Sequence, residues 1–112
     1  MRIGLNAGHT LSGAGSGTSG VIVESIETRK VCSRLTEMFK ACSVEVVPCT
    51  IDKAATQKAY LQKVVEMANR TDLDYFISIH FNNDKARKGH GVEAYTSVSY
   101  THLRAHETLR HL

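Results

Sequence analysis

Two histidines and one glutamate are the residues of this sequence best suited to chemistry. His9 follows an apolar run that opens the chain, His80 follows a second apolar run, and Glu24 stands between them at the start of a helical pattern. Two neutral imidazoles and one carboxylate are a standard ligand set for catalytic zinc. Such sites leave a fourth position for water, whose pKa the metal lowers to about 7. The residue types therefore predict a zinc site on His9, Glu24 and His80.

The elements expected around these residues would bring them together. Residues 3–7 and 75–80 are predicted as buried strands, each closed by one of the histidines. Open α/β sheets bind their ligands outside the carboxyl ends of their strands. Tyr75, Phe76 and Ile77 are apolar on both faces, which predicts a central strand of a parallel sheet.

The other predicted elements alternate between helix and strand. Apolar residues recur at spacings of four, three and four from Val31 to Cys42, which predicts an amphipathic helix from Glu24 to about Cys42. Residues 44–47 are predicted as a strand closed by Pro48, followed by a helix that begins near Asp52. Residues 91–96 are predicted as a fourth strand. The fold class is therefore α/β, with a mainly parallel twisted sheet flanked by helices and the zinc site at the carboxyl ends of its strands.

Composition limits the class of protein. The chain has 112 residues, of which 42% are apolar and 22% charged, as expected for one soluble domain. A net charge of +3 favours loose attraction to anionic polymers, but no basic run interleaved with aromatic residues suggests a nucleic-acid groove. No segment reaches transmembrane length, and the start lacks a basic region followed by an apolar one. We therefore expect synthesis in the cytoplasm without a signal peptide, and no membrane insertion.

The cysteines do not suggest a disulfide framework. Cys32, Cys42 and Cys49 are an odd number without a CxxC pair, which favours free thiols in a reducing compartment. Cys32 and Cys42 lie in the helical pattern and are expected to pack as small hydrophobes. A thiolate zinc site is the alternative, but its spacing is wrong.

Several other motifs have weaker alternatives. Residues 15–20 are a literal GxGxxG, but no strand ends immediately before them, so a loop that passes close to the metal site is expected rather than a dinucleotide site. Glu27 lies one helical turn after Glu24 and competes with it as the carboxylate ligand, and spacing does not separate the two. Glu93 is expected to face solvent on its strand, and His90 to lie in a surface loop. Asn82 and Asn83 could orient a ligand or form a turn.

The segments around the two histidines resemble zinc-dependent N-acetylmuramoyl-L-alanine amidases of the amidase-3 type. The closest likeness is to the catalytic domains of clostridial phage endolysins, over four segments between Met1 and about Tyr95: residues 6–10, 24–29, 78–82 and 91–95. The resemblance implies zinc on His9, Glu24 and His80, with Glu24 preferred to Glu27. It also implies hydrolysis of the amide that joins N-acetylmuramic acid to L-alanine in peptidoglycan, on the cell wall after release from the cell. The alternative function is a zinc- or wall-binding module without turnover.

The sequence departs from the family pattern after residue 96. The family also uses a catalytic glutamate in a later segment, which matches nothing in this chain, so the catalytic residue is unknown and slow turnover is expected. Residues 1–96 are interpreted as the N-terminal part of a truncated catalytic domain, and 97–112 as an adventitious tail that resembles translated adapter sequence. The tail contains His102, His106 and His111, but the HExxH order of zinc proteases is absent. The sequence predicts no oligomeric state.

Overall fold

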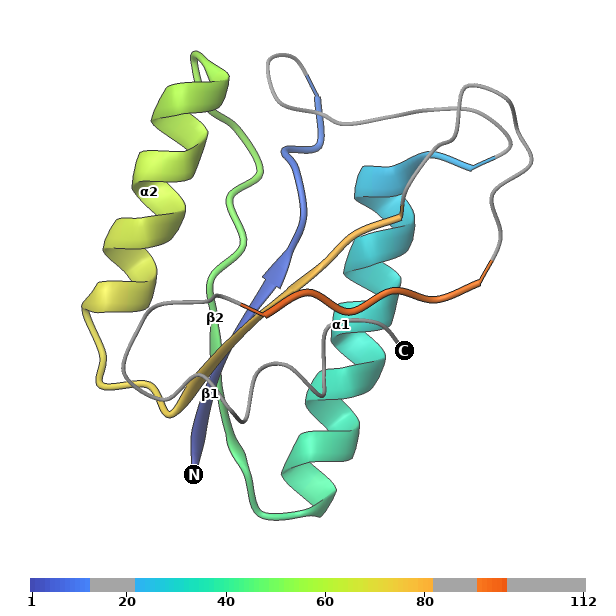
Figure 1. The fold of residues 1–112 in the computed structure, drawn as a ribbon, viewed down its shortest axis with the longest axis vertical. Helices are drawn as coiled ribbons and strands as arrows, with labels where there is room; N and C mark the ends of the chain where they lie inside the picture. The colour runs from blue at the N-terminus through green and yellow to red at the C-terminus, as the bar shows by residue number, and fades with distance from the viewer. Residues whose placement is uncertain (13–21, 82–90, 97–112) are drawn as a thin grey trace.

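Within the described residues, a parallel sheet of three strands and two helices form the body of the protein (Figure 1). The computed structural model describes residues 1–12, 22–81 and 91–96. The elements in chain order are β1 (Arg2–Ala7), α1 (Glu24–Ala41), β2 (Glu45–Pro48), α2 (Gln57–Asn69) and β3 (Tyr75–Ile79). The predicted α/β class with a parallel sheet is thus confirmed.

The strand order is β2-β1-β3, so the chain crosses from β1 to β2 in one direction and from β2 to β3 in the other. Right-handed crossovers in opposite directions place their helices on opposite faces of a sheet. The carboxyl ends of β1 and β3 are in register, with Ala7 opposite Ile79. The residues that follow these two strands therefore leave the sheet side by side.

The prediction that residues 75–77 belong to a central strand is wrong. β1 is the central strand, and β3 lies at the edge of the described sheet. Ile3, Leu5 and Ala7 of β1 are buried, whereas Tyr75 and Phe76 of β3 are 60% and 43% exposed. Apolar residues on both faces of a strand favour its burial. The strand order, however, decides which strand has a neighbouring strand on each side.

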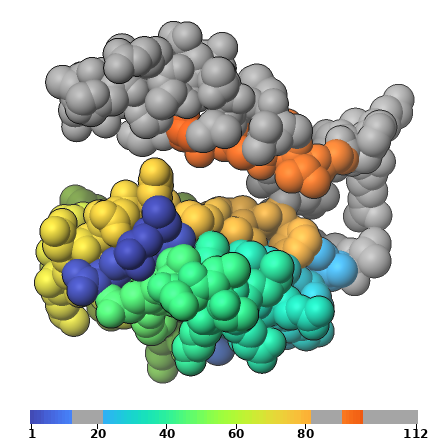
Figure 2. Space-filling view, turned by 90° about the horizontal axis from the view of Figure 1, so that it is seen from below, coloured from blue at the N-terminus to red at the C-terminus, as the bar shows by residue number. Residues whose placement is uncertain are grey.

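The predicted fourth strand at residues 91–96 is also wrong. These residues form no strand, and Val92 and Tyr95 are 77% and 70% exposed. Figure 2 shows this segment in orange, outside the body that the helices and strands form. Alternation of apolar and polar residues indicates a strand only where a neighbouring strand offers hydrogen bonds.

Helix α2 begins later than the sequence predicts. Its N-cap is Thr56, whose hydroxyl accepts a hydrogen bond from the backbone N–H of Ala59 at 3.0 Å. Asp52, the expected start, instead forms an ion pair with Arg29 of α1. The loop after β2 is therefore joined to α1 by the ion pair between Asp52 and Arg29.

The core lies between α1 and the sheet. Leu5, Ala7 and Cys32 are its buried members, and partly buried residues pack against them: Leu35, Val46, Ile77 and Ile79. Burial raises the pKa of the Cys32 thiol, which is consistent with its predicted role as a small hydrophobe. Cys42 is exposed at the end of α1, so the same prediction is wrong for that residue.

The amino ends of the strands are fastened by Arg2. Its backbone N–H donates to a carboxylate oxygen of Asp74 at 2.7 Å, and its guanidinium forms an ion pair with Glu45 and donates to the carbonyl of Asp72. The carboxyl ends of the strands, at the opposite edge, carry the histidines. In the part of the chain that the structure describes, no helix is long and apolar enough to span a membrane.

Candidate metal centre

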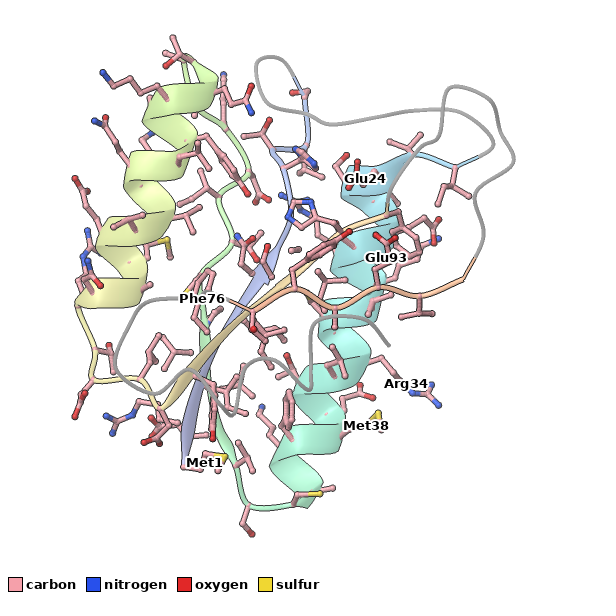
Figure 3. All side chains as sticks on the ribbon, in the orientation of Figure 1. Met1, Glu24, Arg34, Met38, Phe76 and Glu93 are labelled. Atoms are coloured by element: carbon pink, nitrogen blue, oxygen red, sulfur yellow. The ribbon has the colours of Figure 1, made fainter. Side chains whose placement is uncertain are left out.

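The structure brings His9, Glu24 and His80 together at the carboxyl edge of the sheet. His9 follows β1, His80 follows β3 directly, and Glu24 is the first residue of α1. His9 Nε2 lies 3.2 Å from His80 Nδ1, and Glu24 Oε1 lies 3.4 Å from each of these nitrogens. Figure 3 shows Glu24 at the start of α1, at the opposite end of the molecule from Met1. The triangle predicted from sequence is thus present as a geometric cluster.

The size of this triangle fits zinc. A tetrahedral ion with ligands at about 2.0–2.1 Å separates its ligand atoms by about 3.3–3.4 Å. The three observed separations, 3.2, 3.4 and 3.4 Å, agree with that value. The two imidazole rings are nearly perpendicular, at 89°, with centroids 4.9 Å apart. One carboxylate oxygen and two imidazole nitrogens are also the atom types that bind Zn²⁺, a cation of borderline softness.

Burial of the three side chains is graded. The side chain of Glu24 is 3% exposed, that of His9 is 24% and that of His80 is 42%. A buried carboxylate is costly unless positive charge or hydrogen bonds compensate it. Glu24 Oε1 accepts a hydrogen bond from the backbone N–H of Phe81 at 3.0 Å, and the start of α1 favours its negative charge. The cluster is therefore most exposed at His80 and most buried at Glu24.

The structure separates the two glutamates that spacing left open. Glu27 forms an ion pair with Lys30 at 3.1 Å on the solvent side of α1. Only Glu24 joins the histidines, and among the described residues no other His, Cys, Asp or Glu belongs to the cluster. Glu24 is therefore buried at the strand ends, whereas Glu27, one helical turn later, pairs with an exposed lysine.

His9 is held by side chains from both helices. Its φ of 68° is in the left-handed region, which non-glycine residues rarely adopt. Its N–H donates to the hydroxyl of Tyr60 in α2 at 2.9 Å, and its carbonyl accepts from Nη2 of Arg29 in α1 at 3.0 Å. The sequence predicts Tyr60 only as part of the helix that begins near Asp52, and Arg29 only as part of the segment 24–29 that resembles the family. Neither role had a local signal, because both contacts join residues distant in sequence.

Gly8 makes room for the ring of His80. A Cβ on Gly8 would lie 2.5 Å from Cε1 of that ring, far closer than atoms can approach. The hydroxyl of Thr28 in α1 donates to the Gly8 carbonyl at 3.4 Å. The glycine beside the first histidine is therefore explained by packing of the second histidine.

Several residues considered in the sequence do not enter the described site. Glu93 is exposed and accepts a hydrogen bond from the hydroxyl of Tyr95. The remaining candidates lie outside the described residues: the glycine motif at 15–20, Asn82, Asn83, His90, His102, His106 and His111. The described part of the chain adds no catalytic glutamate to the cluster.

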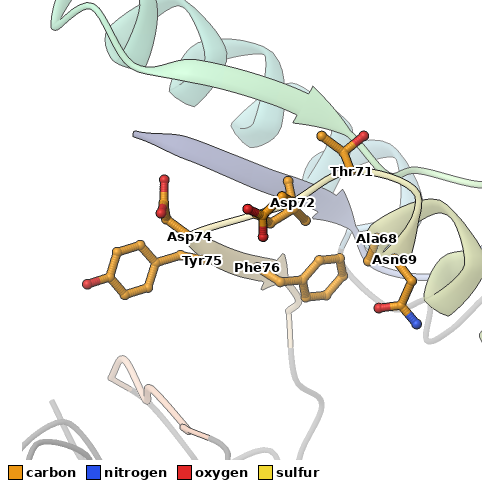
Figure 4. Close-up of a pocket in the computed structure, with 8 residues that line it drawn as sticks. Ala68, Asn69, Thr71, Asp72, Asp74, Tyr75 and Phe76 are labelled. Atoms are coloured by element: carbon orange, nitrogen blue, oxygen red, sulfur yellow. The ribbon is translucent and has the colours of Figure 1, made fainter.

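A shallow pocket lies at the other end of β3 (Figure 4). It has a volume of about 490 Å³ and is formed by the end of α2, the following loop and the start of β3, from Ala68 to Phe76. Of its two acidic residues, Asp74 accepts a hydrogen bond from the backbone N–H of Arg2 through its carboxylate, and Asp72 accepts one from the Arg2 guanidinium through its backbone carbonyl. This pocket brings no histidine or cysteine together with them, so the carboxyl edge remains the candidate centre.

Comparison with known proteins points to one family. A family model described as N-acetylmuramoyl-L-alanine amidase matches residues 3–111. No curated protein and no solved structure gives a significant match. The matched region includes all three residues of the cluster, and it extends past residue 96, where the sequence analysis expects a boundary.

Proposed function

The chain belongs to the N-acetylmuramoyl-L-alanine amidase family, and from this we propose that it binds zinc through His9, Glu24 and His80 to hydrolyse peptidoglycan. The bond cleaved would be the amide between N-acetylmuramic acid and L-alanine. The observation that carries the proposal is the triangle of two imidazole nitrogens and one buried carboxylate oxygen, with sides of 3.2 to 3.4 Å. It lies at the sheet edge where α/β proteins bind their ligands.

Zinc held by His9, Glu24 and His80 would supply Lewis-acid activation of the scissile carbonyl and of a water nucleophile. The chain contributes the shape and charge of the site. Glu24 places one negative charge in a buried position that the Phe81 N–H fixes. The side chain of His80 is 42% exposed, so a glycan-linked peptide would approach the site from the His80 side. Arg29 and Tyr60 fix the backbone of His9.

We further propose that this chain hydrolyses its substrate slowly. The leaving amine must gain a proton, and loss of a positioned general acid or base typically costs about 10²–10⁴ in rate. Among the described residues, no second carboxylate joins the cluster. The same observation favours the second candidate function, a zinc- or wall-binding module without turnover.

The deciding experiment measures new L-alanine amino termini released from purified cell walls, with and without a chelator. The amidase proposal expects chelator-sensitive release, and the binding-module alternative expects zinc binding without release. Full turnover by this chain would contradict the proposal of slow hydrolysis. Walls from clostridia and from unrelated bacteria would test the finer resemblance to clostridial phage endolysins.

Paired substitutions in α1 test the ligand set. Glu24→Gln should lose tight zinc binding and chelator-sensitive release, because it removes the only carboxylate of the cluster within the described residues. Glu27→Gln, one turn away and paired with Lys30, should keep both. His80→Ala should also lose tight zinc binding. Unchanged zinc stoichiometry in Glu24→Gln or His80→Ala would contradict the proposed site.

A further inference from the structure

We propose that Ser78 and Asn6 are positioning residues that fix the tautomer of His80 and thereby present its Nδ1 atom to the metal. The proposal rests on the zinc site proposed above and adds two residues to it. It follows from a chain of hydrogen bonds that begins at a backbone carbonyl, where the direction of donation is not in doubt.

The chain begins at Cys49. Its carbonyl oxygen lies 2.9 Å from the side-chain amide of Asn6, which is 3% exposed. A carbonyl can only accept a hydrogen bond, so the NH₂ group of Asn6 must face it. The amide oxygen of Asn6 consequently faces the other way, toward β3.

The orientation of Asn6 determines that of Ser78. Ser78 lies opposite Asn6 in the register of β1 and β3, and its hydroxyl oxygen lies 2.6 Å from Asn6 Oδ1. Because Oδ1 can only accept, the hydroxyl hydrogen of Ser78 must point to it. A hydroxyl has one hydrogen, so the Ser78 oxygen can then only accept from any other partner.

That other partner is His80 Nε2, at 3.0 Å from the Ser78 oxygen. A hydrogen bond between them requires the hydrogen on Nε2, which leaves Nδ1 without a hydrogen in the neutral ring. Nδ1 is the atom that lies 3.2 Å from His9 Nε2 and 3.4 Å from Glu24 Oε1. The hydrogen bonds and the geometry of the cluster thus select the same nitrogen independently.

The arrangement also limits rotation of the ring. A flip of the His80 ring by 180° would exchange Nδ1 with Cδ2 and Nε2 with Cε1, so it would carry Nδ1 away from His9 and Glu24 and lose the bond between Nε2 and Ser78. Groups that hydrogen-bond the far nitrogen of a metal-binding histidine orient the ring and raise its basicity, and their loss typically lowers metal affinity about 10–100-fold. We therefore expect loss of the Ser78 hydroxyl to weaken zinc binding, although this hydroxyl contacts Nε2 of His80 and not the proposed ligand atom Nδ1.

The direct test is ¹⁵N NMR of histidine-labelled protein loaded with zinc. We expect His80 to retain a hydrogen on Nε2 and to show the metal-induced shift at Nδ1. A retained hydrogen on Nδ1, with zinc at Nε2, would overturn the inference in the unaltered protein. Zinc at Nε2 would still be compatible with a zinc site on His9, Glu24 and His80. Absence of zinc binding by the unaltered chain, in contrast, would overturn the proposed function itself.

Variants provide the second test. Ser78→Ala should bind zinc about 10–100-fold more weakly, and Ser78→Thr, which keeps the hydroxyl, should bind nearly as tightly as the unaltered chain. The control is Ser25→Ala, because the Ser25 hydroxyl is buried beside Glu24 without a hydrogen-bond partner among the described residues. Equal zinc affinity of Ser78→Ala and Ser25→Ala, with metal-free forms equally folded by circular dichroism, would overturn the positioning role.

Discussion

His9 adopts a backbone conformation that costs a non-glycine residue about 1–3 kcal/mol. The surrounding structure must therefore maintain it, and the hydroxyl of Tyr60 and the guanidinium of Arg29 bind the N–H and carbonyl of this residue. Such strain is common where a side chain must be aimed at a ligand. At His9 it directs the imidazole to the end of β3 rather than onward along β1.

Two glycines of the first strand region allow folding and metal binding to be separated. Gly8→Ala should weaken zinc binding strongly, because the added Cβ would lie 2.5 Å from Cε1 of the His80 ring and displace it. Gly4→Ala places its Cβ 2.5 Å from the end of the Leu73 side chain, so it should lower stability and leave zinc affinity nearly unchanged. Zinc titration and thermal unfolding of both variants check this. Equal zinc affinities would show that Gly8 does not position the ring.

At the scale of elements, Arg29 joins α1 to both neighbouring loops. Its guanidinium binds the carboxylate of Asp52 through Nε at 3.0 Å and Nη2 at 2.9 Å, and it also donates to the carbonyls of Ser25, His9 and Ile51. The planar fork of arginine suits several acceptors at once. The loop after β2 and the loop after β1 are thus tied to the helix that carries Glu24.

Arg29→Lys should lower the free energy of unfolding by about 1–3 kcal/mol, because lysine cannot satisfy all of these acceptors. It should also weaken zinc binding, since the His9 carbonyl loses its donor. Arg34→Lys, on the exposed side of the same helix, is the matched control and should change neither property. Urea unfolding and zinc titration measure the two effects. A stability equal to that of Arg34→Lys would contradict the bridging role.

At the scale of the whole molecule, three segments distant in sequence meet only in the folded state. Zinc should therefore stabilise the fold, because the unfolded chain holds no such triangle. Free zinc at 100 times its dissociation constant should add about 2.7 kcal/mol to the free energy of unfolding. Thermal unfolding with increasing zinc tests this, and His80→Ala should abolish the shift. An equal shift in His80→Ala would place the binding elsewhere.

The C-terminal residues offer a second test at this scale. From the sequence, residues 97–112 are predicted to be adventitious, whereas the family match extends to residue 111. We expect a chain ended at Thr96 to unfold at nearly the same temperature as the full chain. If the chain ended at Thr96 had a free energy of unfolding lower by several kcal/mol than the full chain, residues 97–112 would belong to the folded domain.

The sequence by itself determined the candidate site residues and most of the elements. The residue types at His9, Glu24 and His80, the long helix that begins at Glu24 and three of the four predicted strands are local patterns, and the structure contains them. Local periodicity reflects side-chain burial along one segment, and it is strongest where an element packs against a core, as α1 does.

Tertiary structure decided the order of the strands and the fine geometry of the site. Which strand is central depends on crossovers, so the apolar run at residues 75–77 could not reveal that β3 lies at the edge of the described sheet. Three features of the site depend on contacts between distant segments. They are the position of Glu24 rather than Glu27 beside the histidines, the space that Gly8 leaves for the His80 ring, and the hydrogen bond between Ser78 and His80. Such contacts have no sequence period, because they are fixed when parallel strands align their ends and bring separate loops to one edge.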